Sequence, residues 1–171
     1  MRRCGECGGT VRVEKNAVRR YDLGGLPHVE LHGVEVARCG ACGAEELGIP
    51  RIEQLHRVLA THLINQPRLL APVEVRFLRK HIGLSAADFA TCMGVSRETV
   101  SRWQTGKKPL GAQADRLVRL LVATSTPITD YTAKDALAAI DSSRPAPKRP
   151  ARLALRASPD GWRPDRETVA A

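Results

Sequence analysis

The chain has 171 residues, 43% of them hydrophobic, and a formal net charge of +9. This length is enough for one or two small domains with their own cores. The sequence has no apolar run of about 18 residues and begins without the apolar segment of a secretory signal, so it excludes a membrane span and predicts a cytoplasmic protein.

Two Cys-x-x-Cys pairs lie near the start of the chain. Each pair places two thiolates on a single turn, and glycines stand beside both pairs, where they let the backbone fold around an ion. Four thiolates fill the tetrahedral coordination of a structural zinc ion and leave no open position. We therefore predict one structural Zn²⁺ per chain, bound by Cys4, Cys7, Cys39 and Cys42.

Two other uses of paired cysteines stay open at this point. Disulfide bonds are typical of exported chains, and nothing in the sequence indicates export. A thioredoxin-like redox pair lies within a βαβ pattern, which surrounds neither pair here. His28 and His32 lie between the two pairs, and with four cysteines available we expect them to be ordinary strand or loop residues.

The segment between the pairs has the alternation of β-strands. Strands are predicted over residues 10–21 and 29–38, and the alternation shifts at Gly33, which indicates a bulge. A helix follows over residues 49–64, with an apolar stripe of Ile52, Leu55, Leu59 and Leu63 that packs on the strands or on a second copy of the chain. Together these elements form a predicted zinc-binding, β-rich domain of residues 1–66. The edge of the second strand is an expected partner surface.

Residues 84–106 have the pattern of two short helices joined by a tight turn. Ser85 and Ser96 are expected to cap the two helices, and Gly94 supplies a left-handed residue between them. An apolar cluster between the helices comprises Phe89, Met93, Val95, Val100 and Trp103. This spacing is that of a helix-turn-helix, and the stretch resembles the XRE/Cro-type family. The alternative is a helical hairpin in an unrelated α-domain.

Helices are also predicted over residues 72–82, 111–123 and 133–140, which completes an all-α domain of residues 67–140. The 111–123 helix is expected to bury Ala114, Leu117, Val118 and Leu121 and to provide most of a homodimer contact. We interpret the fifth cysteine, Cys92, as a small buried apolar residue.

The positive charge is concentrated in the second half of the chain. The net charge is +1 over residues 1–66, +5 over residues 67–140 and +3 over residues 141–171. This distribution favours a phosphate-binding surface on the second domain. We expect the second helix of the pair to read base edges through Arg97, Glu98, Thr99 and Arg102, with Ser96, Lys107 and Lys108 on phosphates.

Residues 141–171 contain five prolines and seven basic residues without hydrophobic periodicity. Such a segment buries too little apolar surface to offset the entropy of ordering, so we predict a disordered basic tail. The predicted fold class is thus α+β: a small N-terminal Cys4 zinc domain, then a Cro-type helix-turn-helix domain, then the tail.

The combination of these motifs over residues 1–125 resembles the MqsA-type antitoxins with their YgiT-type zinc finger. The resemblance implies a zinc domain that neutralises a cognate toxin and a second, dimerising domain that represses its own operon at a palindromic DNA operator. Two residues four positions apart contact bases in that family, an Asn and an Arg. The Arg corresponds to Arg102, and Glu98 stands at the Asn position.

Three functions remain open from the sequence. The first is a nucleoid-associated repressor that serves as the antitoxin of a type II toxin–antitoxin pair. The second is a stand-alone zinc-containing regulator that responds to metal or oxidant and has no toxin. The third is a zinc-ribbon enzyme, which we do not expect, because no pairing of nucleophile and base stands out.

Overall fold

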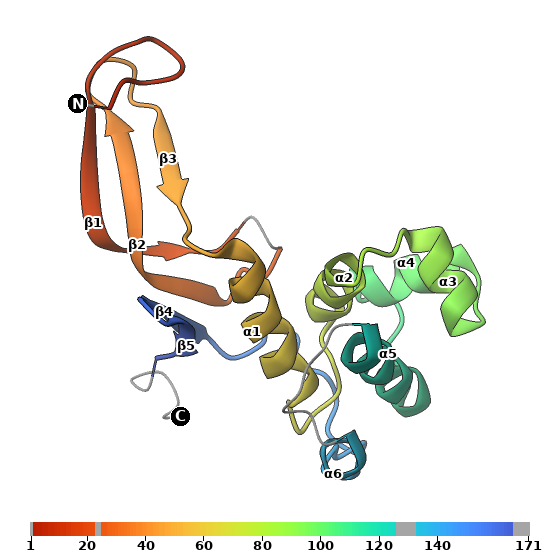
Figure 1. The fold of residues 1–171 in the computed structure, drawn as a ribbon. Coiled ribbons are helices and arrows are strands. Elements are labelled where there is room, and N and C mark those ends of the chain that lie inside the picture. Colours follow the sequence, from red (N-terminus) through yellow and green to blue (C-terminus); the bar gives the residue numbers. More distant parts are fainter. Residues whose placement is uncertain (1, 23–24, 126–132, 166–171) are drawn as a thin grey trace. The chain divides into compact units, whose positions relative to one another are not determined.

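The computed structural model describes residues 2–22, 25–125 and 133–165. It combines a β-sheet with several helices, so the predicted α+β class is confirmed (Figure 1). Contacts divide the chain into two compact units. Unit 1 comprises residues 1–22, 27–55 and 152–171, and unit 2 comprises residues 23–26 and 56–151. In sequence, unit 2 is therefore an insertion between the first and last parts of unit 1.

The long antiparallel hairpin of unit 1 follows the predicted strands. β1 (Val11–Arg20) pairs with β2 (Val29–Cys39), and the register shifts on both sides of Ala17. Asn16, with φ of 57°, and Gly33, with φ of 77°, lie at these shifts on the two strands. Because of the bulge at Gly33, the apolar residues before and after it all face the core, and Val29, Leu31, Val34 and Val36 are all buried.

Three further strands complete the sheet on the other edge of β2. β3 (Glu45–Gly48) pairs with the second half of β2, and β4 (Leu153–Ser158) runs parallel to its first half. β5 (Gly161–Pro164) pairs with β4. Figure 1 shows these C-terminal strands beside β2. The prediction that the edge of residues 29–38 is open to a partner is wrong, since β2 is paired on both sides.

The prediction of a disordered tail is also wrong for residues 153–164. Leu153, Ala154 and Leu155 are buried against the sheet, and the Trp162 indole donates to the carbonyl of Pro50 over 2.8 Å. Leu153 N also donates to the His28 carbonyl. The burial of these apolar side chains against the sheet and the parallel hydrogen bonds with β2 offset the entropy of ordering, which the segment cannot do on its own.

Gly161 of this C-terminal hairpin is a position where a side chain would be strained. Its φ is +131°, and a Cβ atom there would overlap the Gln54 side-chain amide. Gln54 can move aside, but the backbone conformation remains unfavourable for any L side chain, at a cost of about 1–3 kcal/mol.

We expect Gly161→Ala to speed hydrogen exchange of the β4 and β5 amides by about tenfold, measured by mass spectrometry on the full chain. Gly111→Ala is the matched control, because Gly111 has no positive φ and a Cβ atom added there would meet no other atom within 4 Å. Equal exchange in both variants would show that β4 and β5 are not held in this conformation.

Unit 2 contains the helices. α1 (Ile52–Ile64) begins in unit 1 and continues into unit 2, and α2 (Pro72–His81), α3 (Ala86–Met93) and α4 (Arg97–Thr105) follow. α5 (Ala112–Ser125) and the short α6 (Ala133–Ala138) complete it. α4 packs on both α2 and α3, and α5 also contacts these two helices. Within the described ranges, no helix is long and apolar enough to cross a membrane.

A buried polar network fastens the segment between α1 and α2. Asp115 and Arg119 of α5 are both fully buried and form an ion pair of 2.6 Å. Arg119 also donates to the carbonyls of Ile64, Gln66 and Arg68 over 2.5–2.8 Å, and Asp115 accepts from Leu70 N at 2.7 Å. The segment of residues 64–70 is therefore held by hydrogen bonds to α5.

Three predictions of burial are wrong. α5 buries the face that carries Asp115, Val118, Arg119 and Val122, so Leu117 is 38% exposed. Ile52, at the start of the α1 stripe, is 43% exposed, although Leu55, Leu59 and Leu63 are buried as expected. Cys92 is exposed, because the inward face of α3 is occupied by Phe89, Ala90 and Met93.

Candidate functional site

The two cysteine pairs form equivalent turns in unit 1. In the first turn Gly8 N donates to the Cys4 carbonyl, and in the second Gly43 N donates to the Cys39 carbonyl, over 2.9 and 3.1 Å. Gly8 and Gly43 both have left-handed φ, of 70° and 73°. This conformation turns the chain back after each second cysteine, and it explains why glycine follows both pairs.

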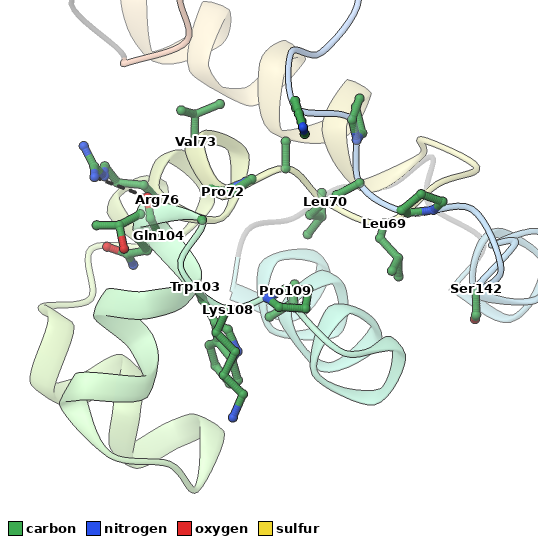
Figure 2. A pocket seen from close by; sticks show the side chains of 18 of the residues that line it. Leu69, Leu70, Pro72, Val73, Arg76, Trp103, Gln104, Lys108, Pro109 and Ser142 are labelled. Atoms are coloured by element: carbon green, nitrogen blue, oxygen red, sulfur yellow. Dashed lines mark hydrogen bonds between the residues drawn. The ribbon is translucent and has the colours of Figure 1, made fainter.

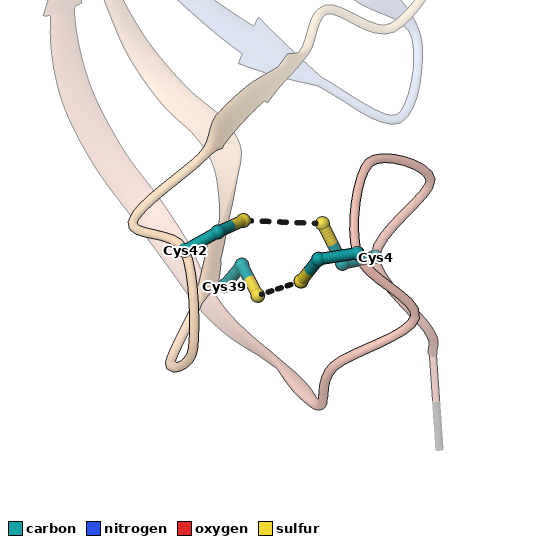
Figure 3. A group of neighbouring side chains, drawn as sticks. Cys4, Cys39 and Cys42 are labelled. Atoms are coloured by element: carbon teal, nitrogen blue, oxygen red, sulfur yellow. Dashed lines mark hydrogen bonds between the residues drawn. The ribbon is translucent and has the colours of Figure 1, made fainter.

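The turns bring the four sulfur atoms together (Figure 3). All four Sγ atoms lie within 4.8 Å of one another, with 3.7 Å between Cys4 and Cys42 and 3.5 Å between Cys7 and Cys39. A tetrahedron with metal–sulfur bonds of about 2.3 Å has sulfur–sulfur edges of about 3.8 Å. A disulfide requires about 2.05 Å. The tetrad of Cys4, Cys7, Cys39 and Cys42 can therefore hold a metal ion.

The electrostatics of the tetrad are compatible with a bound cation. N–H groups of Cys42 and Ala41 donate to the Cys39 sulfur and lower its pKa from 9.0 to about 6. At Cys42 the N–H of Ala44 lowers the pKa, but the neighbouring Cys7 and Cys39 thiols outweigh it and raise the pKa to about 12. Four thiols this close ionise together only when a metal balances their charge.

The space around the tetrad is closely filled at one position. A Cβ atom on Gly9 would lie 3.2 Å from the sulfurs of both Cys7 and Cys39 and 3.0 Å from Ala41 Cβ. Gly9 therefore lets the first turn approach the second. The histidines lie apart from the tetrad: His32 Nε2 is 2.9 Å from Glu30 Oε1, and His32 belongs to β2, as the strand assignment predicts.

The second candidate site is the exposed face of α4. The Ser85 and Ser96 hydroxyls accept from Asp88 N and Thr99 N, so both expected caps are confirmed. Gly94 ends α3 with φ of 64°, the left-handed turn that the sequence predicts. Phe89, Met93, Val100 and Trp103 are buried, and Val95 is half-buried. These contacts hold α4 with one face inward and the opposite face in solvent.

The structure brings the expected DNA-contacting residues to this outward surface. Arg97, Glu98 and Arg102 are exposed on α4, Thr99 is half-buried, and Ser96 is the exposed cap. Lys107 and Lys108 are exposed just after Gly106, whose φ of 76° ends the helix. Arg102 forms an ion pair of 2.6 Å with Glu98, one turn earlier. A shallow hollow on this surface is lined by Glu98, Ser101, Arg102 and Lys107.

The burial of Gln104 and the pairing of Asp115 with Arg119 were not predicted from the sequence. Gln104 is buried although it belongs to the polar sequence Arg-Trp-Gln-Thr. Asp115 and Arg119 are four residues apart, on the same helical face as the buried Val118 and Val122. That spacing within an apolar stripe is the signal that could have identified a buried ion pair.

Comparison of the chain with models of protein families, with curated proteins and with solved structures finds no match.

Proposed function

We propose that this protein is a sequence-specific, DNA-binding repressor in which α3 and α4 form a helix-turn-helix of the Cro type. The observation that carries the proposal is α4 itself. It is capped at Ser96, buries Val100 and Trp103, and leaves its arginines exposed on the opposite face. A recognition helix needs this division, because one face packs on the domain while the other enters the major groove.

The outward side chains have the chemistry to read a base pair. The Arg102 guanidinium can donate to O6 and N7 of guanine, and the Glu98 carboxylate can accept from N4 of cytosine. In the free protein these two groups satisfy each other. Because Arg102 and Glu98 are one helical turn apart, the two side chains can reach neighbouring base positions in the major groove. Ser96, Lys107 and Lys108 are proposed to contact phosphates, with Arg97 and Thr99 as further base contacts.

We expect Arg102→Ala to weaken binding to the operator by about 1–3 kcal/mol and to relax sequence preference, because a lost base contact affects specific DNA more than random DNA. The measurement is fluorescence anisotropy with the DNA upstream of the protein's own reading frame and with a scrambled duplex of the same length.

Arg12→Ala is the charge-matched control for this experiment, since Arg12 is an exposed residue of β1. Arg12→Ala should have little effect on binding to either duplex. If Arg102→Ala weakened both duplexes equally, Arg102 would be a phosphate contact. If it weakened neither, α4 would not be the recognition helix.

A palindromic operator requires a homodimer that holds two recognition helices about one DNA turn apart. Leu117 and Leu120 of α5 are 38% and 36% exposed, and Leu121 beside them is half-buried. Exposed leucines that are adjacent on a helix favour a contact with a second copy. We propose α5 as the dimer contact.

We further propose that the tetrad binds one structural Zn²⁺ and that unit 1 binds a cognate toxin, which makes the protein the antitoxin of a type II pair acting in the cytoplasm. The resemblance to MqsA-type antitoxins supports this, together with the low net charge of unit 1, where 12 Lys and Arg residues against 11 Asp and Glu residues give +1, which suits a protein partner better than DNA. The test is co-purification of the full chain with the product of the neighbouring reading frame, with loss of that protein's toxicity on co-expression.

The alternative is a stand-alone regulator without a toxin and without enzymatic activity. The observation that favours it is the accessibility of the tetrad, since Cys7 and Cys42 are exposed. Exposed cysteine thiolates react with oxidants. If hydrogen peroxide released the metal and changed DNA affinity, while the neighbouring gene product failed to bind, the alternative would replace the antitoxin proposal.

A further inference from the structure

A cavity of about 840 Å³ lies within unit 2 at the C-terminal end of α4 (Figure 2). Its walls come from the start of α2, the end of α4, the loop that follows α4, and residues 142–148. Apolar side chains provide much of this lining, among them Leu70, Trp103, Pro109 and Pro147. Small-molecule sites have volumes of about 300–1,000 Å³ and mostly apolar walls, so the cavity is of suitable size.

One buried polar group in the lining has no partner in the described part of the chain. Gln104 is 9% exposed, and its Nε2 atom is buried without a hydrogen-bond acceptor. A buried amide donor left unpaired costs about 1–3 kcal/mol. A ligand that presents an acceptor oxygen would remove this cost, and the site therefore selects for a carbonyl or carboxylate.

The charged residues of the lining favour a carboxylate over a carbonyl as the acceptor. Arg76, Lys108 and Lys148 line the cavity, and no aspartate or glutamate is among its described lining residues. Arg76 Nη2 donates to the main-chain carbonyl of Gln104 over 3.3 Å, which places a guanidinium beside the backbone of that residue (Figure 2). Three cations without a carboxylate favour an anion over a neutral ligand.

We propose that this cavity binds a small amphipathic monoanion, an aromatic carboxylate about the size of an indole or naphthalene derivative. Its rings lie against Trp103 and the prolines, and its carboxylate accepts from Gln104 Nε2 and pairs with the lysines. Residues 142–148 close one side of the cavity, which fits a small molecule better than a long peptide.

Binding of the anion has a consequence that rests on the proposed function. Lys108 lines the cavity and is also a proposed phosphate contact. A carboxylate that attracts the Lys108 ammonium removes it from DNA, so the ligand acts as an inducer that weakens operator binding. Coupling between two sites is typically about 5- to 150-fold in affinity, and we expect about fivefold or more.

The test is isothermal titration calorimetry of the full chain with 1-naphthylacetate and with 2-(1-naphthyl)ethanol, which has the same rings without the charge. We expect one naphthylacetate per chain and at least tenfold weaker binding of the alcohol. Gln104→Met and Lys148→Met should each weaken naphthylacetate binding about tenfold. Lys80→Met is the control and should leave it unchanged, since Lys80 is exposed on α2 and does not line the cavity.

Equal binding of acid and alcohol, no binding of either at 1 mM, or unchanged binding in both cavity variants would overturn the proposal. If Gln104→Met failed to fold by circular dichroism, Lys148→Met alone would decide. Calorimetry uses no DNA, so its outcome is independent of the repressor proposal. Naphthylacetate that binds without weakening operator binding would overturn the inducer role only.

Discussion

Cys39→Ser is expected to abolish metal binding and to unfold the metal-binding end of unit 1. Residues 2–16 contain no buried side chain, and of residues 39–48 only Cys39 is buried. The turns around the tetrad therefore have no apolar core of their own. A structural zinc ion contributes about 10–16 kcal/mol to folding in small peptide sites, which makes metal binding and folding one equilibrium. Chelation of the wild-type protein should have the same effect.

Two measurements check this result. Elemental analysis should give one zinc per wild-type chain and none in Cys39→Ser, and hydrogen exchange should show fast amides over residues 2–10 and 39–48 of the variant. Cys92→Ser is the matched control, because Cys92 is an exposed cysteine of α3 outside the tetrad. Full metal content in Cys39→Ser, or iron in place of zinc in the wild type, would contradict the assignment.

The loss of structure after metal removal should be confined to the metal-binding end of unit 1. Val29, Leu31 and Leu155 are buried in the part of the sheet that includes β4, and unit 2 has its own core around Leu78, Phe89 and Val100. We therefore expect slow exchange to persist there after metal removal. General loss of protection across α2–α5 would show that the metal stabilises both units.

Arg119→Ala is expected to destabilise unit 2 by about 3–5 kcal/mol. Both members of the Asp115–Arg119 pair are fully buried, so the substitution leaves an uncompensated carboxylate in the core. It also removes the donor to the carbonyls of Ile64 and Gln66 and to that of Arg68. Urea unfolding monitored by Trp103 fluorescence, in a Trp162→Phe background, measures the change.

Arg116→Ala on the same helix is the control, since Arg116 is half-exposed and donates to the exposed Ser142 hydroxyl over 3.3 Å. It should change the free energy of unfolding by less than about 1 kcal/mol. The double substitution Asp115→Leu with Arg119→Met removes the buried charges but leaves the three carbonyls and Leu70 N unpaired. It should remain destabilised. A stability equal to that of the wild type would show that the network holds no essential hydrogen bonds.

The local features of the candidate sites were accessible from sequence. The Cys-x-x-Cys pairs, the serine caps of α3 and α4 and the left-handed Gly94 all depend on residues within one or two turns of each other. Even the bulge at Gly33 followed from a shift in the alternation of a single strand. In each case the physical requirement and the residue that meets it are neighbours in the chain.

The features that depend on distant segments were not accessible in this way. β4 has only six residues between proline-rich stretches, and its partner β2 lies far earlier in the sequence. Composition alone therefore predicted disorder. The sequence predicted that the leucines of α5 face inward. Apolar periodicity cannot show that a distant segment of the chain offers carbonyl acceptors to Arg119. The cavity beside Gln104 likewise forms from three separate segments of unit 2, within residues 69–76, 103–110 and 142–148.

The position of β4 also sets the order in which the protein is completed during translation. Both cysteine pairs and β2 lie within the first 42 residues and are synthesised early. β4 begins at Leu153, after all of unit 2. At about 5–20 residues per second, the first half of β2 waits roughly 6–24 s for its neighbour. The nascent chain can take up metal early, yet it exposes a bare strand edge until β4 has been synthesised. A chaperone that covers this edge would act only within that interval.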